Sequence, residues 1–335
     1  MFAYRSRLIW LVLFCWSAVL LAQCAPVTTT TDPVWLTRLD PGGSYSYREA
    51  KWSPNSEQIV FTRREVVSGD PVYEKTRSSE IFVMDVGTRE VRQLTHNDYF
   101  DLAPVWSPDG NRIAYIRDEA VYGDQAENDV TTGSIRIMNS DGTDDREIFS
   151  CPYGCWWLAW SPRDDRIAFT MRLSKHVPGQ TVDGPSAEVF LIDTDGSNLV
   201  QLTEGDSPAG DSGWSSDGQQ IAFLRSDRSI RVLNIQDRVE TAYAVGDMLA
   251  INSPLWSADQ SRIIFSAGQR DRPLAQLFSL NLSNGQIAPV FDTLLNMPEI
   301  DMYEPDWSPD GTKLVFTSFL RKLYLVDTVA AGLSK

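Results

Sequence analysis

One short motif recurs through the chain: a tryptophan and a serine, a tight turn and then an apolar triplet. The fullest copy is Trp106-Ser107-Pro108-Asp109-Gly110, followed closely by Ile113-Ala114-Tyr115. The motif occurs six times, and its tryptophans, spaced 54, 54, 54, 42 and 51 residues apart, are Trp52, Trp106, Trp160, Trp214, Trp256 and Trp307. A self-similar unit of this length indicates a repeat architecture, in which each unit packs against its neighbours.

Each part of the motif has a structural meaning. The turn at 108–110 combines a proline that presets φ with a glycine that takes a positive φ, which a Cβ would oppose. The triplet after the turn is typical of a buried strand. A third strand follows in segments such as 81–85 and 189–193, each ending in a polar turn. With four strands in each of six units, we predict an all-β fold, a six-bladed β-propeller of four-stranded antiparallel blades.

The two ends of the chain are predicted to meet in one blade. Leu94-Thr95 and Leu202-Thr203 end the first and third units, and the same pair occurs early in the chain at Leu36-Thr37. The C-terminal segment 322–327 supplies a third strand with no fourth strand after it. Adding 34–39 as the outermost strand of that blade closes the ring and removes exposed sheet edges.

The repeat resembles the WD40-like (PD40) repeat of TolB-type β-propellers, whose hallmark is Trp-Ser-Pro-Asp-Gly followed by a short strand of the Ile-Ala-Phe type. The resemblance extends over about residues 34–330. It implies the propeller fold for the segment 34–331. We expect no counterpart of the N-terminal α/β domain of TolB, so the resemblance does not carry that protein's role.

The first 23 residues are predicted to be a signal peptide. Arg5 and Arg7 precede an apolar run over 8–22, which is shorter than a usual membrane span. We therefore expect an extracytoplasmic protein.

Cys24 follows the apolar run at the place where it resembles the lipidated cysteine of a bacterial lipoprotein signal. Gln23 departs from that pattern, which has a small residue just before the cysteine. A secreted protein cut nearby and an uncleaved anchor remain alternatives. We expect a lipid anchor at Cys24, with 24–33 as a polar tether, on the cell membrane or in the periplasm.

The charge of the chain restricts its partners. Its formal net charge is −15, and removal of the leader with Arg5 and Arg7 would bring it to −17. A nucleic-acid binder needs a basic footprint, so nucleic acid is disfavoured as a partner. Docking on anionic lipid through charge alone is disfavoured for the same reason.

The longer units carry extra chain in one place. A four-stranded blade needs about 40 to 45 residues, and the extra residues of the 54-residue units fall between the second and third strands, at 65–79, 117–133 and 173–187. In a four-stranded meander these loops emerge on the same face as the connections between blades, which include the long segment 291–304. Insertions in repeat proteins usually map to one face, often the binding face.

Acidic and aromatic residues are frequent in these loops and connections. The predicted binding face consists of Asp98, Tyr99, Phe100, Asp101, Tyr153, Trp156, Asp206, Asp211, Asp247, Asp301, Tyr303 and Glu304. If they converge at one mouth of the channel, the focused negative potential would favour a basic peptide or a cation. The alternative is a surface that is acidic everywhere, with ordinary solvated loops.

Two cysteines lie close together in the sequence. Cys151 and Cys155 flank a Pro-Tyr-Gly turn, and outside the cytoplasm such a pair can form a disulfide. A zinc site would need more cysteine or histidine ligands than occur nearby. We expect no metal site and no cofactor.

One segment suggests catalysis at first sight. Gly210-Asp211-Ser212-Gly213 resembles the surroundings of a serine-protease nucleophile, but it precedes Trp214 as every blade entry precedes its tryptophan. With His96 and His176 as the two histidines of the chain, a catalytic triad is poorly supplied.

Two functions of different classes remain. The first is a monomeric, non-enzymatic binding module whose loop-rich face holds an envelope protein or a basic peptide. The second is a propeller hydrolase or lyase that uses acidic or metal-binding residues at the channel mouth. An enzyme should place two or more carboxylates within hydrogen-bonding reach in a pocket, whereas a binder should show a broad, aromatic-rimmed surface. A purely structural or sensory-adaptor propeller is a third option.

Overall fold

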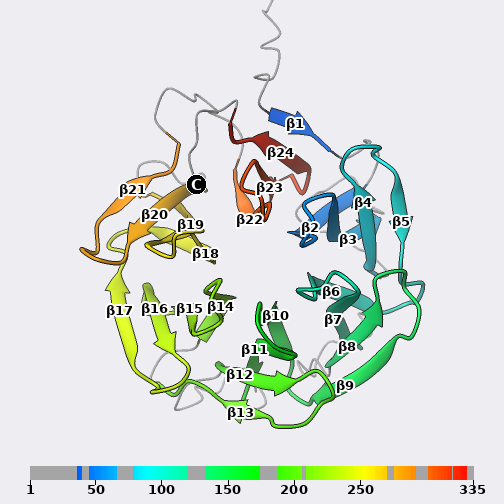
Figure 1. Ribbon diagram of the computed structural model, residues 1–335, viewed down its shortest axis with the longest axis horizontal. Coiled ribbons are helices and arrows are strands. Elements are labelled where there is room, and N and C mark those ends of the chain that lie inside the picture. Colours follow the sequence, from blue (N-terminus) through cyan, green and yellow to red (C-terminus); the bar gives the residue numbers. More distant parts are fainter. Residues whose placement is uncertain are drawn as a thin grey trace, which may run out of the picture. The chain divides into compact units, whose positions relative to one another are not determined.

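The structure is a computed structural model that describes residues 36–39, 45–65, 78–119, 133–173, 187–205, 209–269, 275–291, 301–318 and 320–329. In these ranges 24 strands form six four-stranded antiparallel sheets, arranged as blades around a central axis (Figure 1). These ranges contain no helix, and hence none long and apolar enough to cross a membrane. The predicted six-bladed propeller is confirmed.

Each blade is a meander that runs outward from the channel. The innermost strands are β2 (Tyr45–Trp52), β6 (Phe100–Trp106), β10 (Cys155–Trp160), β14 (Ala209–Trp214), β18 (Leu249–Trp256) and β22 (Tyr303–Trp307). The second strands are β3 (Gln58–Glu65), β7 (Arg112–Asp118), β11 (Arg166–Arg172), β15 (Gln220–Arg225), β19 (Arg262–Gly268) and β23 (Lys313–Thr317). The third strands are β4 (Glu80–Asp85), β8 (Gly133–Asn139), β12 (Ala187–Asp193), β16 (Ser229–Asn234), β20 (Gln276–Asn281) and β24 (Leu323–Asp327). The outermost strands are β5 (Val91–Gln93), β9 (Arg146–Cys151), β13 (Val200–Gln201), β17 (Glu240–Ala244), β21 (Ile287–Pro289) and β1 (Leu36–Arg38).

The ring closes through the two ends of the chain. Strand β1 pairs antiparallel with β24, with Leu36 opposite Val326 and Arg38 opposite Tyr324 (Figure 1). The N–H of Leu39 donates to the Leu323 carbonyl at 2.8 Å. The predicted closure is therefore confirmed in the sixth blade, where the N-terminal strand covers the edge that β24 would otherwise expose.

The serine of the motif organises the first turn of each blade. Ser107 Oγ donates to Asp109 Oδ1 at 2.6 Å and accepts the N–H of Arg112 at 2.9 Å, while Gly110 has φ 72°. Five of the six motif serines donate in this way to an Asp or Asn side chain two residues later. The serine and the acid thus satisfy the polar groups of the turn within the turn itself.

Three of the motif tryptophans join neighbouring blades through their indole N–H groups. Trp52 Nε1 donates to the Asp306 carbonyl of the sixth blade at 3.2 Å, and Trp256 Nε1 donates to the Gly213 carbonyl of the fourth at 3.1 Å. Trp214 Nε1 makes the same bond to Ala159 at 3.0 Å. A buried indole usually finds an acceptor for its N–H, and in these three blades that acceptor lies on the preceding blade. The indole N–H groups of Trp106 and Trp160 are buried and have no acceptor among the described residues.

The recurring Leu-Thr pair also has a structural role. Thr95 Oγ1 donates to Glu80 at 2.6 Å and accepts the N–H of Ile81 at 2.9 Å. Thr203 makes the corresponding bonds to Glu188 and to the N–H of Val189. The threonine therefore fastens the end of a unit to the start of its third strand.

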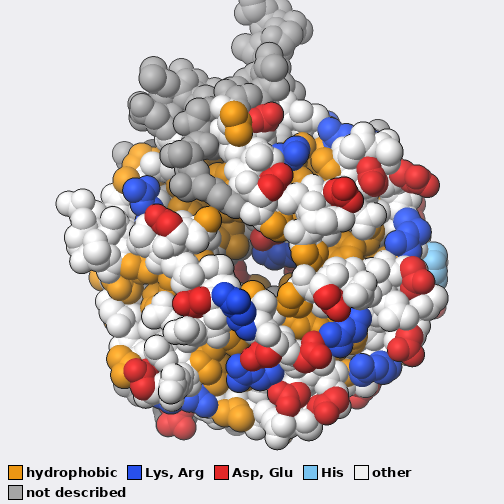
Figure 2. Space-filling model, in the orientation of Figure 1, with side chains coloured by type: hydrophobic (Ala, Val, Ile, Leu, Met, Phe, Trp, Pro, Cys, Tyr) orange, Lys and Arg blue, Asp and Glu red, His pale blue; other side chains and the backbone are white. Residues whose placement is uncertain are grey.

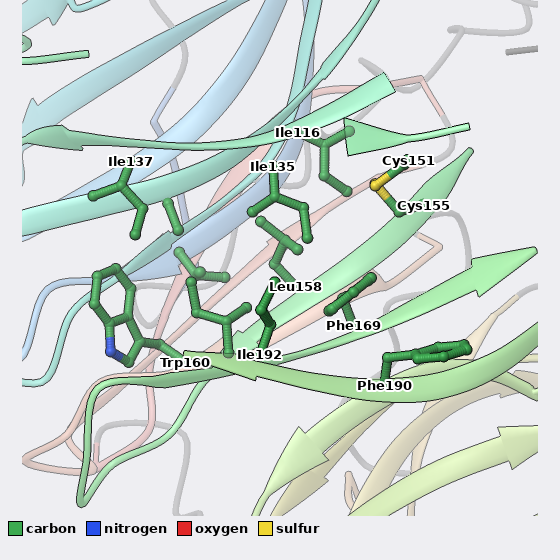
Figure 3. Close-up of a cluster of buried hydrophobic side chains, with 13 residues drawn as sticks. Ile116, Ile135, Ile137, Cys151, Cys155, Leu158, Trp160, Phe169, Phe190 and Ile192 are labelled. Atoms are coloured by element: carbon green, nitrogen blue, oxygen red, sulfur yellow. A yellow bond between two sulfur atoms is a disulfide. The ribbon is translucent and has the colours of Figure 1, made fainter. Parts of the chain in front are cut away.

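Hydrophobic side chains fill the space between blades. Between the second and third blades they include Ile135, Leu158 and Phe169, and a disulfide joins Cys151 to Cys155 at the edge of this cluster (Figure 3). Cys151 ends β9 and Cys155 begins β10. The disulfide therefore lies at the crossing from one blade to the next.

Candidate binding site in the central channel

The innermost strands of all six blades line a central cavity of about 1270 Å³. Figure 2 shows the ring open at its centre, with hydrophobic side chains around the opening. Because each blade contributes the same part of its repeat, equivalent sequence positions meet at equivalent places around the channel.

The residue three places before each motif tryptophan lies at a break in the strand pairing. In every blade the register between the innermost and second strands shifts at this position. We call these six residues, all of which line the cavity, the channel ring: Glu49, Ala103, Trp157, Asp211, Ser253 and Glu304. All of them except Asp211 have a left-handed backbone, with φ between 50° and 55°. Such bulges re-aim a side chain, and here they present it to the channel.

The three acids of the channel ring link blades. Glu304 Oε2 accepts the N–H of Glu49 at 2.7 Å, and Glu49 Oε2 accepts the N–H of Ala103 at 2.6 Å. Asp211 Oδ2 accepts the N–H of Ser253 at 2.6 Å. Each carboxylate thus satisfies the N–H of the ring residue in the next blade, so its first role is structural.

Burial shifts the ionisation of these acids. It raises the pKa of Asp211 to about 6; the negative charge of Glu304 adds to this rise, and the Ser253 N–H and Lys51 oppose it. Burial, with repulsion from Glu304, also raises the pKa of Glu49. Burial raises the pKa of Asp306 against the attraction of Lys51. The channel therefore holds carboxylates whose charged forms are incompletely solvated.

Charge is unevenly distributed along the channel wall. The described acidic residues that line it are Glu49, Asp211, Asp259, Glu304 and Asp306, and the described basic ones are Arg48, Lys51, Arg262 and Arg321. Acids and bases are thus nearly balanced in number in the described lining.

The wall has two different halves. The charged half is the lining contributed by blades one, five and six; it holds eight of these nine residues and an ion pair between Lys51 Nζ and Asp306 Oδ1 at 3.5 Å. The apolar half is the lining contributed by blades two, three and four, where Asp211 is the one charged residue among those that the structure describes. Trp157 belongs to the apolar half and is 43% exposed.

The predicted binding-face residues fall into separate places. Three of them, Asp211, Tyr303 and Glu304, line the channel. Four are exposed outside the described lining: Asp98, Tyr99, Tyr153 and Asp247. Trp156 is half-buried beneath the guanidinium of Arg172, which lies 5.2 Å from its ring centroid.

Three other predicted residues are buried in the fold. Phe100 is 6% exposed. Asp101 pairs with Arg117 Nε at 2.8 Å, and Asp301 accepts the N–H of Ala275 at 2.7 Å. These bonds give both acids a structural role, so the two carboxylates are not part of an exposed face.

Several predictions concern residues outside the described ranges. These are the signal peptide, the tether, Cys24, Asp206 and His176, together with most of the long insertions and the connection over 292–300.

Three channel-ring residues that matter here were not among the predicted binding-face residues: Glu49, Trp157 and Ser253. Each looks like an ordinary strand residue in its own unit. Comparing the six units column by column, counting back three from each tryptophan, would have placed them beside Asp211 and Glu304.

Within the described ranges, no three His, Cys, Asp or Glu side chains gather closely enough to hold a metal ion. The hydrogen bonds to Glu49 and Glu304 come from backbone N–H groups and from the hydroxyls of Thr62 and Thr317. These two acids are therefore engaged by the scaffold.

Comparison with known proteins supports the reading of the repeat. A model of the TolB β-propeller domain (PD40) matches residues 175–321. The structure of TolB from Acinetobacter baumannii superimposes with a TM-score of 0.54 at 16% identity, over 84% of this chain and 63% of that one. The chain is a TolB-type β-propeller repeat protein. A second model, for the N-terminal region of dipeptidyl peptidase IV, matches residues 66–188 of this TolB-type propeller.

Other similar proteins differ in what their names state. The uncharacterized peptidase YuxL of Bacillus subtilis is 23% identical over 207 residues, which is 53% of this chain and 29% of that protein. An uncharacterized protein of Agrobacterium fabrum is 26% identical over 182 residues, 52% of this chain and 53% of that protein. The chain thus spans about half of one of these relatives and less than a third of the other.

An oligogalacturonate lyase in complex with manganese superimposes with a TM-score of 0.56 at 16% identity, over 87% of this chain and 79% of that one. At this identity the likeness concerns the fold alone.

Proposed function

We propose that this TolB-type propeller is an extracytoplasmic, lipid-anchored binding module that takes a basic peptide segment of an envelope protein into its central channel. The observation that carries the proposal is the channel ring, which places three carboxylates and an exposed tryptophan around one cavity of about 1270 Å³. Carboxylates bind lysine and arginine side chains through charge-assisted hydrogen bonds, and an indole face attracts the same cations.

The location is supported by the sequence and by the disulfide. Arg5, Arg7 and the apolar run over 8–22 form a secretory leader, and Cys24 stands where a lipid would be attached. The Cys151–Cys155 disulfide suits an oxidising compartment. Two free thiols in the folded, unreduced protein would contradict this part of the proposal.

The anchor can be tested separately by labelling cells with radioactive palmitate. We expect label in the wild-type protein and none in Cys24→Ser. A wild-type protein without label would show that the propeller is secreted or held in another way.

The binding role can be tested by photo-crosslinking in the cells that produce the protein. A benzophenone amino acid replaces Trp157 in the channel, and in a control it replaces Val239, which is 58% exposed on the outer side of blade four. We expect one protein adduct from the channel position and none from the control position. No adduct from the channel, or the same adducts from both positions, would overturn the proposal.

A further inference from the structure

We infer that the apolar half of the channel holds a subsite for an organic cation, the ammonium or guanidinium group of a lysine or arginine side chain, formed by Asp211 and Trp157. This inference rests on the proposed function. It specifies which group of the partner is recognised, and where.

Asp211 supplies the charge. Its Oδ2 accepts the N–H of Ser253 at 2.6 Å and lies 3.2 Å from the Ser253 hydroxyl. Its Oδ1 is buried and has no hydrogen-bond partner among the described residues, although the residue is 9% exposed. A buried carboxylate oxygen without a donor is costly, so a cationic donor that reached it would gain more than it would at the surface.

The apolar half of the described lining, to which Asp211 belongs, contains no basic residue. Lys51 and Glu304, which influence its ionisation, belong to blades one and six of the charged half. Lys51 is already paired with Asp306 at 3.5 Å. The neighbouring lining on β14 includes Ser212 and Gly213, which carry no charge.

Trp157 supplies the second contact. It lies on β10, which packs against β14, the strand of Asp211. Its backbone is left-handed, with φ 55°, a conformation that bulky residues rarely adopt. Ala103, Ser253 and two glutamates share that conformation elsewhere in the ring. The repeat therefore sets the backbone, and at this position it presents an exposed indole to the channel.

An aromatic side chain and a single carboxylate that line the same half of one cavity suit an organic cation better than a metal ion. A lysine or arginine side chain can place its charge over an indole within about 6 Å of the ring centre while donating to a carboxylate. Calcium takes 6 to 8 oxygen ligands, and the described residues contain no acidic cluster of even three members that could hold a metal.

The test is binding of a dye-labelled, end-blocked tetralysine peptide to the mature protein at low salt, followed by fluorescence anisotropy. The norleucine counterpart of the peptide keeps the alkyl chains without the charges. Asp211→Asn keeps an oxygen for the Ser253 N–H and removes the charge, and Trp157→Leu removes the aromatic face. Glu147→Gln, an exposed acid on the outer strand β9, is the control for overall charge.

We expect Asp211→Asn to weaken tetralysine binding by about tenfold or more, as loss of a charge-assisted contact should, and Trp157→Leu by about fivefold. Glu49→Gln, which removes one charge from the charged half, should weaken it by about threefold or less, because its attraction acts at long range and is screened. Glu147→Gln should bind as the wild type does. The norleucine peptide should not bind.

Three outcomes would overturn the inference. The first is wild-type affinity in both Asp211→Asn and Trp157→Leu, and the second is equal losses in all four variants, which would indicate diffuse attraction. The third is equal binding of the norleucine peptide. Each can occur while the channel still crosslinks to a partner, so failure of the subsite is distinguishable from failure of the proposed function. If Asp211→Asn failed to fold, Trp157→Leu would still decide between these outcomes.

Discussion

The two halves of the channel wall are built from the same repeat but differ in how their carboxylates are hydrogen-bonded. In the charged half, Glu49 and Glu304 each accept a backbone N–H, and Asp306 accepts the N–H of Trp52 at 2.8 Å besides pairing with Lys51. In the apolar half, Asp211 makes the same link to the next blade but keeps one oxygen without a partner among the described residues.

This difference shows that one backbone device can serve two purposes. The bulge directs a side chain toward the channel in every blade, and an acid at that place can fasten two blades together. Whether one carboxylate oxygen then stays available for a ligand depends on the residues around the acid. We therefore interpret the charged half mainly as scaffold and the apolar half as the place where a ligand group is recognised.

The largest expected effect concerns the scaffold of the charged half. Deleting 34–39 removes β1, exposes the edge of β24 and leaves the pockets of Leu36 and Leu39 empty; each leucine is 5% exposed. We expect a loss of at least about 4 kcal/mol in the free energy of unfolding, because two buried leucines are lost together with the ring closure.

Hydrogen exchange can localise that effect. Amides in β22–β24 should lose protection first, while those in β10 and β14 keep it longer. Unchanged cooperative unfolding after the deletion would show that the closure contributes little and that the two halves are equally supported.

The next effect is expected from the ion pair of the charged half. Lys51→Met leaves the half-buried carboxylate of Asp306 without its cation, 3.5 Å away in the wild type. We expect a loss of about 2 kcal/mol, toward the low end for breaking such a pair because both partners keep some contact with solvent. Urea denaturation at pH 8 measures it. If the Lys51→Met variant were as stable as the wild type, the stability of the charged half would not depend on this ion pair.

Measuring the free energy of unfolding as a function of pH tests two buried acids, the structural acid Glu80 and the channel acid Asp211. Burial raises the pKa of Glu80 to about 7 and that of Asp211 to about 6, above their ordinary values of 4.5 and 3.8. The folded protein therefore binds more protons at these two groups than the unfolded chain does between about pH 4 and pH 7. Their contribution to stability is fully present below pH 4 and is lost as the pH rises through 6 and 7.

The two shifts together correspond to a fall of about 4 kcal/mol in the free energy of unfolding between pH 5 and pH 8. Because solvent screening reduces such contributions, we expect a measured fall of about 1 to 2 kcal/mol. Glu80→Gln should flatten the part of this slope near pH 7, and Asp211→Asn the part near pH 6. Turn acids such as Asp259, whose pKa is lowered to about 2 by hydrogen bonds from Ser257 and Ser261, act in the opposite sense at lower pH. Stability that rises from pH 5 to pH 8 would contradict the assignment.

The smallest expected effect is on the stability of Asp211→Asn, which tests whether Asp211 is a structural acid or a ligand-binding one. Asp211→Asn keeps an acceptor for the Ser253 N–H and removes a poorly solvated charge, so its stability at pH 8 should equal that of the wild type or exceed it by about 1 kcal/mol. Thermal unfolding of the two proteins side by side measures this. A clear loss of stability would place Asp211 with the structural acids and remove the contrast between the two halves.

Much of the fold could be predicted because its determinants are local. A tryptophan, a serine and a Pro-Asp-Gly turn specify where two strands meet, and the serine satisfies the turn within five residues of chain. The pair Leu36-Thr37 identified the closing strand because it repeated the end of other units. Asp101 shows the limit of such reasoning. It looked like a loop acid, but it is completely buried and forms hydrogen bonds with Arg117 and Asn97.

The sequence by itself determined the repeat, the number of blades, the closure of the ring and the acidic character of the chain, since each depends on residue types at fixed short spacing. The tertiary structure decided which acids are linked and which one keeps an oxygen without a partner. Glu304 reaches Glu49 across 255 residues of sequence, and Trp157 and Asp211 come to line one cavity because β10 and β14 lie side by side in the ring. Contacts between distant repeats exist after the ring closes, and no local pattern records them.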